Sequence, residues 1–170
     1  GLVSSIAAGH NLQQAVLRHA KINSRQSNLN AGVAIHSLRA VAPAEIVGLT
    51  SQSGSAPVHI HIAEQTKEVA DCLAHTGLRP VEWLLANANL DARWNLVHAT
   101  HSSASEIQGI QAQQASVVIC PTTEANLGDG FFNLTEAMHQ SMRWSIGTDS
   151  HVNRNWSEEL RLLEYGGRLS

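Results

Sequence analysis

The sequence predicts an α/β fold built on a parallel β-sheet. Short apolar or β-branched segments alternate with helical segments, and the predicted strands start roughly 20–40 residues apart, which is the spacing of βαβ repeats. Histidines and carboxylates also collect where the predicted strands end. Periodicity alone leaves two alternatives open, an open doubly wound sheet and a closed barrel. No glycine-rich G-x-G-x-x-G follows a predicted strand, which argues against a dinucleotide-binding fold.

Composition narrows the class of protein. The 170 residues suffice for one domain with a sizeable core, and 11 Lys+Arg nearly balance 14 Asp+Glu. Because there is no basic run, neither a nucleic acid nor a membrane surface is expected as a partner. No apolar run approaches the ~18–20 residues of a spanning helix. The start does not resemble a signal peptide, and Cys72 and Cys120 lie far apart, so a cytoplasmic setting is expected.

The first half of the chain contains two of the predicted strands. Residues 1–30 form a helical lead-in, with a helix from Leu2 to Arg25 and then a polar break. A buried strand is expected at Ala31–Ile35. Pro43 opens the next helix, because proline is well tolerated in a first turn. The β-branched run Val58–Ile62 is the second strand.

The middle of the chain is predicted from helix-end signals. A helix that follows Glu64 ends at Gly77, and another helix starts near Pro80. Trp94–His98 is the third strand. Ser103 and Glu106 have the spacing of a capping box, so a helix begins there.

The last part of the chain completes five strand–helix units. Ser116–Cys120 and Arg143–Gly147 are the fourth and fifth strands. Between them we predict a glycine-containing loop at Pro121–Asn133 and a helix at Leu134–Met142. A final helix at Glu158–Tyr165 is predicted to stop at the two following glycines.

Polar residues follow four different predicted strands. In a parallel α/β sheet the carboxyl ends of the strands form one rim, where active sites are built from several strands. We therefore expect one active site at this rim. The pairs that follow the strands are His36 with Arg39, His61 with Glu64, His98 with His101, and Asp149 with His151.

The chemistry of these residues favours a metal-dependent hydrolase. His59 and His61 share one face of their strand, because side chains alternate with period 2. An imidazole from His61 and a carboxylate from Asp149 suit Zn²⁺, with Fe²⁺ or Mn²⁺ as alternatives. Such a metal lowers the pKa of its bound water to about 7. The alternative is a buried strand whose histidines hydrogen-bond to their neighbours.

Roles for the other residues follow from their types. Glu64 could carry a proton to the substrate if the chain curls at the strand end. His98 could polarise or orient the group under attack, and Asp149 could accept the proton of the water. Arg39 offers a fork of donors for a substrate carboxylate, unless it pairs with an acidic residue of the next helix. Cys120 is expected to be a buried thiol.

Six segments together resemble the formimidoylglutamate deiminase family of the amidohydrolase superfamily. The resemblance runs from about residue 31 to the end, and the first thirty residues match less distinctly. The His-x-x-Glu and Thr-Asp-Ser-His pieces occur across many deaminases of the superfamily, whereas His-Ser-Leu-Arg and Leu-Gly-Asp-Gly point to this family. The segments are His36–Val41, His59–Gln65, Leu96–His101, Cys120–Gly130, Gly147–His151 and Glu158–Gly166.

The resemblance implies a (β/α)₈ barrel of TIM type, of which residues 1–170 are a partial hydrolase domain covering about strands 4 to 8. It implies one divalent metal, usually zinc, held by His61 and Asp149 and by a first-strand His-x-His that this chain does not supply. Glu64 becomes the proton shuttle and His98 the sixth-strand histidine. His36 and Arg39 would bind the carboxylate of a small acidic amidine.

The implied reaction is hydrolysis of N-formimino-L-glutamate to N-formyl-L-glutamate and ammonia, a step of histidine degradation. The full-length protein is expected to form a homodimer, and the chain alone, as a fragment, is expected to be inactive. Three alternatives stay open. They are a deaminase of purine, pyrimidine or triazine rings, a non-catalytic half-barrel, and a smaller complete metallohydrolase in which His59-Ile60-His61 is the first-strand motif.

Overall fold

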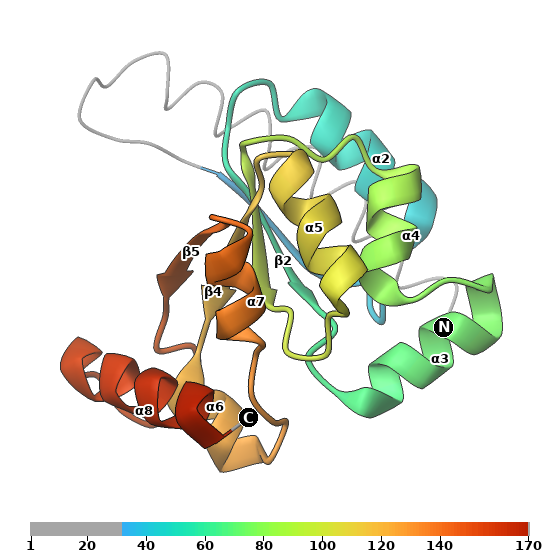
Figure 1. The fold of residues 1–170 in the computed structure, drawn as a ribbon. Helices are drawn as coiled ribbons and strands as arrows, with labels where there is room; N and C mark the ends of the chain where they lie inside the picture. Colours follow the sequence, from blue (N-terminus) through green and yellow to red (C-terminus); the bar gives the residue numbers. More distant parts are fainter. Residues whose placement is uncertain (1–31, 170) are drawn as a thin grey trace, which may run out of the picture.

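A computed structural model of the chain describes residues 32–169, which form one five-stranded parallel sheet (Figure 1). The predicted helix at Leu2–Arg25 lies outside the described residues. The strands lie side by side in chain order, each hydrogen-bonded in parallel to the next. Their bounds are Val33–Ser37 (β1), Val58–Ile62 (β2), Trp94–His98 (β3), Ser116–Ile119 (β4) and Arg143–Ile146 (β5).

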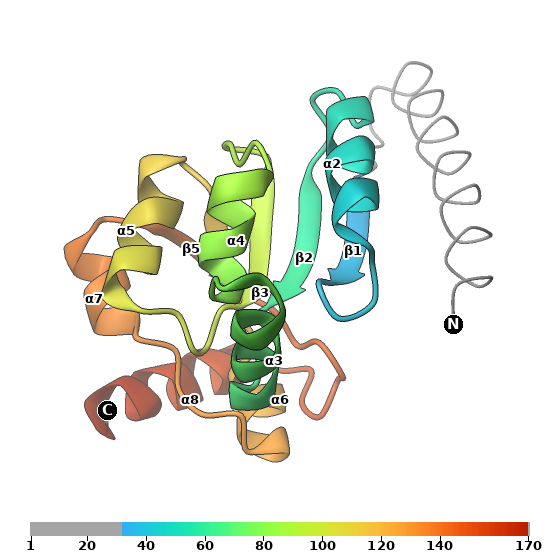
Figure 2. The same cartoon turned by 90° about the vertical axis from the view of Figure 1, so that its right-hand side faces the viewer.

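Helices connect each strand to the next. Figure 2 shows α2, α4 and α5 packed along the strands, with α3 and α6 beyond the ends to which the strands point. The helix bounds are Pro43–Gln52 (α2), Thr66–Thr76 (α3), Pro80–Asn87 (α4), Ala104–Ala112 (α5), Pro121–Leu127 (α6), Leu134–His139 (α7) and Trp156–Leu169 (α8).

The strand order decides between the two architectures that the sequence left open. A doubly wound sheet reverses its strand order at a switch point, whereas a (β/α) barrel adds each strand beside the previous one. The sequential order β1-β2-β3-β4-β5 is that of the barrel, so the sheet is an incomplete part of a TIM-type barrel.

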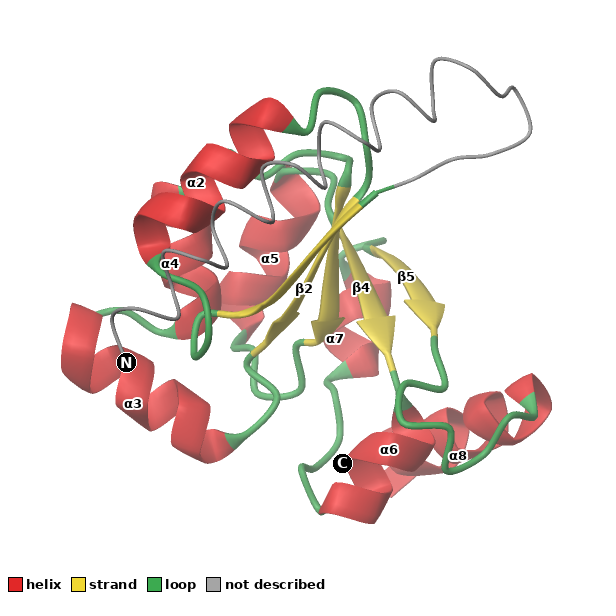
Figure 3. Cartoon of the chain, turned by 180° about the vertical axis from the view of Figure 1, so that it is seen from behind, coloured by secondary structure: helices red, strands yellow, loops and turns green. Residues whose placement is uncertain are grey.

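The two faces of the sheet differ in burial. Figure 3 shows α4 and α5 behind the strands, on one face of the sheet. In β1 to β4, alternate side chains are buried in the core, while their neighbours on the other face are exposed or half-buried. That second face is the one that lines the inside of a barrel. The buried set is Val33, Ile35, Val58, Ile60, Trp94, Leu96, Val117 and Ile119.

Predicted helix ends are confirmed at two places. Ser103 caps α5, because its Oγ accepts the Glu106 N–H at 3.2 Å while the Glu106 Oε2 accepts the Ser103 N–H at 2.7 Å. Gly77 ends α3 in the left-handed conformation with φ of 76°, and its N–H donates to the Leu73 carbonyl at 2.9 Å.

Two predictions are wrong. The segment predicted as the loop Pro121–Asn133 contains α6, which starts with Pro121 in its first turn and ends at Gly128 with φ of 73°. The last helix does not stop at Gly166 but continues to Leu169. Gly166 instead permits close packing, because a Cβ there would lie 2.5 Å from the ring of Phe131.

No described helix combines the length and the hydropathy that a bilayer crossing requires.

Candidate active site at the carboxyl ends of the strands

The three histidines that end β1, β2 and β3 lie beside one another at one rim of the sheet. The ring centroids of His36 and His61 are 5.4 Å apart, and those of His61 and His98 are 5.6 Å apart with the rings stacked. Asp149, which follows β5, places its Oδ2 3.9 Å from the His98 Nε2. The parallel sheet therefore gathers side chains that are up to 113 residues apart (149 minus 36).

Glu64 reaches this rim because the chain turns sharply at the end of β2. Ala63 has φ of 49°, which takes the backbone out of the extended conformation and redirects the residue that follows. The Glu64 Oε1 then lies 3.6 Å from the His98 Nε2. Glu68, in the first turn of α3, holds this turn by accepting the Ala63 and Glu64 N–H groups at 3.1 and 3.0 Å.

His61 has the hydrogen bond that a metal-binding imidazole requires. Its Nδ1 lies 2.7 Å from the backbone carbonyl oxygen of His36. A carbonyl only accepts, so Nδ1 carries a proton in this contact and Nε2 is the nitrogen that could bind a metal. His59 lies one pleat deeper on the same face, and burial lowers the pKa of its imidazole.

His98 is fully buried between three carboxylates. Its Nδ1 lies 3.1 Å from the Glu124 Oε1, and Glu64 and Asp149 flank its Nε2. Burial by itself lowers the pKa of this imidazole, but the hydrogen bond and charge of Glu124, with the charges of Glu64 and Asp149, outweigh burial and raise it above its ordinary value. His98 has φ of 69°, a left-handed backbone that is uncommon for residues other than glycine.

Arg39 is engaged with acidic groups of this rim. Its Nη2 donates to the Glu64 Oε2 at 2.7 Å, and its Nε lies 3.9 Å from the Glu68 Oε2 in α3. The ion-pair alternative raised from the sequence is thus present, with Glu64 as the main partner rather than a residue of α2. The Nη1 group donates to none of the described residues, and the side chain is 36% exposed, so donors remain for a ligand.

Asp149 sits on a tight turn after β5. Its own φ is 42° and that of His151 is 58°, and the His151 N–H donates to the Thr148 carbonyl at 2.9 Å. These left-handed conformations cost free energy in residues other than glycine, and they cluster at functional sites. Asp149 and the imidazole of His61 are a donor set that fits a divalent metal such as Zn²⁺.

Two residues of the site were missed by sequence reasoning, Glu68 and Glu124. Both are buried, at 3% and 2% exposed, and both bind backbone or side-chain groups of the rim. Glu124 was hidden because its short helix was predicted as loop. The available signal was an acidic residue in a first helical turn after Pro121, where a carboxylate reaches free N–H groups.

Cys120 confirms the prediction of a buried thiol. It is 2% exposed, and burial together with the nearby charges of Glu124, Asp149 and Glu159 raises its pKa to about 12. Ligand atoms of His98, Cys120 and Glu124 lie within 4.8 Å of one another. We assign this group to hydrogen bonding, because the Glu124 Oε1 already accepts the Cys120 N–H at 2.8 Å and lies 3.1 Å from the His98 Nδ1.

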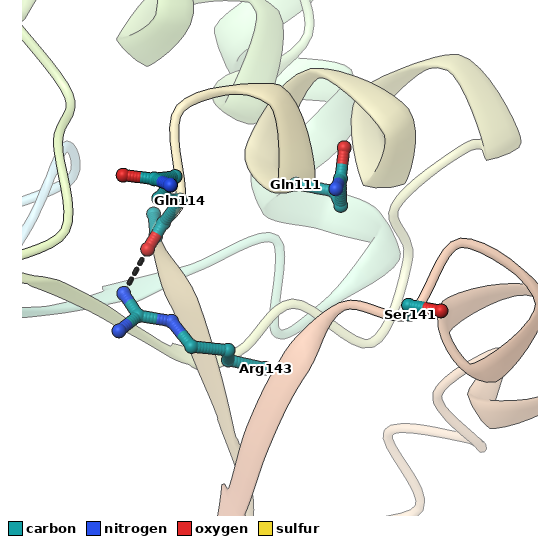
Figure 4. A pocket seen from close by; sticks show the side chains of 5 residues that line it. Gln111, Gln114, Ser141 and Arg143 are labelled. Carbon is teal, nitrogen blue, oxygen red and sulfur yellow. Dashed lines mark hydrogen bonds between the residues drawn. The ribbon is translucent and has the colours of Figure 1, made fainter.

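A cavity of about 240 Å³ lies at the end of the sheet opposite the rim, where β4 and β5 begin (Figure 4). Arg143 donates there to the Gln114 carbonyl, which Figure 4 shows as a dashed line, and to the Ala92 carbonyl at 3.1 Å. Its lining holds no carboxylate or imidazole, so it offers none of the chemistry of the rim. The lining residues are Gln111, Gln114, Ala115, Ser141 and Arg143.

Comparison with known proteins identifies the family. The sequence profile described as "Amidohydrolase family" matches residues 4–167, which is nearly the whole chain. The chain belongs to the amidohydrolase family. The resemblance inferred from the motifs is thereby confirmed, and the parallel sheet with its rim of histidines and carboxylates is this family's fold in part.

Individual relatives sharpen the comparison. The chain is 51% identical over 139 residues to the formimidoylglutamate deiminase of Pseudomonas aeruginosa, covering 81% of this chain and 31% of that protein. It is 33% identical over 111 residues to 5-methylthioadenosine/S-adenosylhomocysteine deaminase 2 of Archaeoglobus fulgidus, covering 65% and 27%. The chain therefore spans about a third of the length of the curated relatives that it matches.

Solved structures agree with the fold. An amidohydrolase from Brucella melitensis superposes with a TM-score of 0.79 at 53% sequence identity, over 81% of this chain and 31% of that chain. An adenosine deaminase from Xanthomonas campestris, solved with bound zinc, superposes with a TM-score of 0.77 at 27% identity, over 81% and 33%.

Proposed function

We propose that this chain is part of a metal-dependent hydrolase that deiminates N-formimino-L-glutamate to N-formyl-L-glutamate and ammonia. The observation that carries the proposal is the rim itself, where Arg39 lies beside Glu64, and Glu64 beside His98 and Asp149. The 51% identity to a formimidoylglutamate deiminase supports the substrate. A step of histidine degradation is part of the same proposal.

A divalent metal fits the donors of this chain. His61, with its Nδ1 bound to the His36 carbonyl, and Asp149 would hold it together with ligands from outside the described residues. Zinc is the expected metal because a related structure contains it, and Fe²⁺ is the alternative. The metal would supply Lewis acidity and a water that is acidic enough to attack at neutral pH.

The protein's own residues would handle the protons and the orientation of the substrate. Asp149 would take one proton from the attacking water, and the second would come off the resulting hydroxyl group as the carbonyl forms. Glu64 would pass both protons in turn to the departing nitrogen, which leaves as ammonia. The Nε2 of His98 faces the space between these two carboxylates and orients the amidine. The oxygen that adds to the formimino carbon replaces the nitrogen that leaves, so the product is a formamide.

Arg39 and His36 would bind the glutamate end of the substrate. Arg39 keeps its Nη1 donors free of the described residues, and His36 is exposed near the end of β1, three residues before Arg39. A guanidinium prefers a carboxylate partner with two parallel hydrogen bonds. Binding of the substrate then competes with Glu64 for Arg39, which would release Glu64 to transfer protons.

A deaminase of heterocyclic rings is the second candidate, favoured by the 33% identity to a methylthioadenosine deaminase. It would share Glu64, His98 and Asp149, but a ring substrate such as 5-methylthioadenosine, unlike S-adenosylhomocysteine, has no carboxylate for Arg39. The two candidates therefore differ in what Arg39 contributes to substrate binding.

The test is Arg39→Ala in the full-length protein that carries this segment. For N-formimino-L-glutamate we expect KM to rise by about 100-fold, because a charge-assisted bidentate contact is worth about 1.5–3 kcal/mol or slightly more. Arg39→Lys keeps the charge but not the fork and should restore only part of the loss. Turnover of a ring substrate, with a KM that is the same in the unsubstituted enzyme and in Arg39→Ala, would contradict the proposal.

A further inference from the structure

Glu124 is a buried carboxylate that the proposed reaction does not use. It lies in the first turn of α6 and is 2% exposed. Its Oε1 accepts the Cys120 N–H at 2.8 Å and lies 3.1 Å from the Nδ1 of His98. Because a carboxylate only accepts, Nδ1 is the protonated nitrogen of this contact.

The other nitrogen of the His98 ring, Nε2, has an unusual environment. The His98 Nε2 is buried, yet it has no hydrogen-bond partner among residues 32–169. It lies 3.6 Å from the Glu64 Oε1 and 3.9 Å from the Asp149 Oδ2. A buried polar atom without a partner costs free energy, so such an atom facing two carboxylates indicates a position prepared for a ligand.

Glu124 is therefore the group that decides which nitrogen faces the rim. If the imidazole turned by half a rotation about its Cβ–Cγ bond, Nδ1 would leave Glu124 and the ring would present carbon atoms where nitrogen atoms are needed. The hydrogen bond to Glu124 opposes this rotation. The strand end cannot do so by itself, because its backbone fixes Cβ but leaves the ring torsion free.

We propose that Glu124 is the positioning residue of His98, holding Nδ1 so that Nε2 points at the substrate between Glu64 and Asp149. The proposal rests on the proposed function only in taking His98 as the residue that orients the amidine. Positioning of this kind resembles the carboxylate–histidine pairs that orient metal-bound and catalytic imidazoles in other enzymes, whose loss costs about 10- to 100-fold in activity.

Three substitutions of Glu124 in the full-length, metal-loaded enzyme separate positioning from charge. E124Q keeps an acceptor oxygen that can serve both N–H groups but removes the charge, and we expect kcat to stay within about 5-fold. E124D keeps the charge but retracts the acceptor by one methylene, and E124M removes it. For both we expect kcat to fall by about 10- to 100-fold with KM within about 3-fold.

Glu159 provides the matched control. It is also fully buried, in α8, and accepts the Thr122 N–H at 2.9 Å and the Thr122 hydroxyl at 2.6 Å, but it contacts none of the predicted site residues. E159M should therefore lower thermal stability and leave kcat of the folded enzyme within about 2-fold. An equal loss of kcat in E159M and E124M would assign the effect to the fold and overturn the positioning role.

A double-mutant cycle tests whether Glu124 acts through His98. In the background of His98→Asn, adding E124M should cost less than about 3-fold, because the residue that Glu124 positions is already gone. If the fold-losses of kcat in His98→Asn and in E124M multiply in the double variant, the proposal is contradicted. If E124M does not fold, the comparison of E124D with E124Q decides, because a purely electrostatic role predicts the reverse order of their kcat values.

These outcomes are separate from those of the proposed function. The cycle uses whichever substrate the unsubstituted enzyme turns over, so a failure to deiminate N-formimino-L-glutamate refutes the substrate alone. A crystal structure of E124M adds a readout without turnover. We expect the His98 ring to have rotated, with Nε2 no longer within about 4 Å of either carboxylate, and an unchanged ring would overturn the positioning role.

Discussion

Four buried glutamates share one task at the residue scale. Glu68, Glu106, Glu124 and Glu159 are each at most 3% exposed, and each accepts at least one backbone N–H of a segment near the rim. Burial of a carboxylate is expensive unless several donors compensate it. Each glutamate thus stabilises one particular path of the segment that it binds. Only Glu68 and Glu124, of these four, bind a group of a predicted site residue, namely the Glu64 N–H and the His98 imidazole.

Opposing effects act on the pKa of the buried Glu68 carboxyl group. Burial raises the pKa of its carboxyl group, while the charge of Arg39 and the two N–H groups of residues 63 and 64 lower it, with burial the larger influence. Arg39 therefore serves two carboxylates at once, Glu64 and Glu68. This arrangement links Arg39, the residue that we propose to bind the substrate carboxylate, to the turn that places Glu64.

Cys120 permits a prediction at the residue scale. With a pKa of about 12, only about one Cys120 thiol in ten thousand is ionised at pH 8, and the thiolate is the reactive form. We expect iodoacetamide at pH 8 to modify half-buried Cys72 well before buried Cys120, as read by peptide mass spectrometry. Equal labelling of the two thiols in the folded protein would contradict the burial of Cys120.

At the scale of elements, the structure shows why some helices could be predicted and one could not. A capping box predicts the start of α5. Gly77 predicts the end of α3, and Pro80 predicts the start of α4. The helix α6 has only seven residues and buries a glutamate and a threonine in place of an apolar stripe. Periodicity cannot detect a helix whose inward face is polar.

The cap of α5 leads to a prediction about stability. Ser103→Ala leaves the Glu106 N–H without its acceptor, and we expect the free energy of unfolding to fall by about 1 kcal/mol. Urea denaturation of the full-length protein measures this as a lower midpoint. Ser51→Ala is the matched control, because Ser51 is exposed near the end of α2 and its hydroxyl, among residues 32–169, donates only to the Gly48 carbonyl. Its effect should stay within about 0.5 kcal/mol.

At the scale of the whole molecule, the parallel sheet brings residues that are far apart along the chain together at one rim. The contacts run without a break from His36 to His61, from there to His98, and on to Glu64 and Asp149, with Arg39 attached through Glu64. The inward face of the sheet is exposed or half-buried along its length. An incomplete barrel explains this exposure, because the remaining strands of a barrel would cover that face.

The incomplete barrel predicts how the 170-residue chain behaves alone. The two metal ligands that we propose in it, His61 and Asp149, are about half of the set that the family resemblance implies. We expect the isolated chain to lose zinc on dialysis and to show no deiminase turnover, measured by elemental analysis and by ammonia release. The full-length protein under the same conditions is the control. Tight stoichiometric zinc with full activity in the isolated chain would contradict this expectation.

The sequence by itself determined the alternation of strands and helices, and the bounds of β2 and β3 in full, because β-branched and apolar runs record local burial. It also named His36, Arg39, His61, Glu64, His98 and Asp149, since residues that follow parallel strands must share one rim.

Only the tertiary structure decided the sequential strand order, the ion pair of Arg39 with Glu64, and the hydrogen bond of Glu124 with His98. The physical reason is the separation along the chain between the groups that meet. Local periodicity reports which side of an element is buried, but which groups meet across 25 or 26 residues depends on how the elements pack, and no local pattern carries that information.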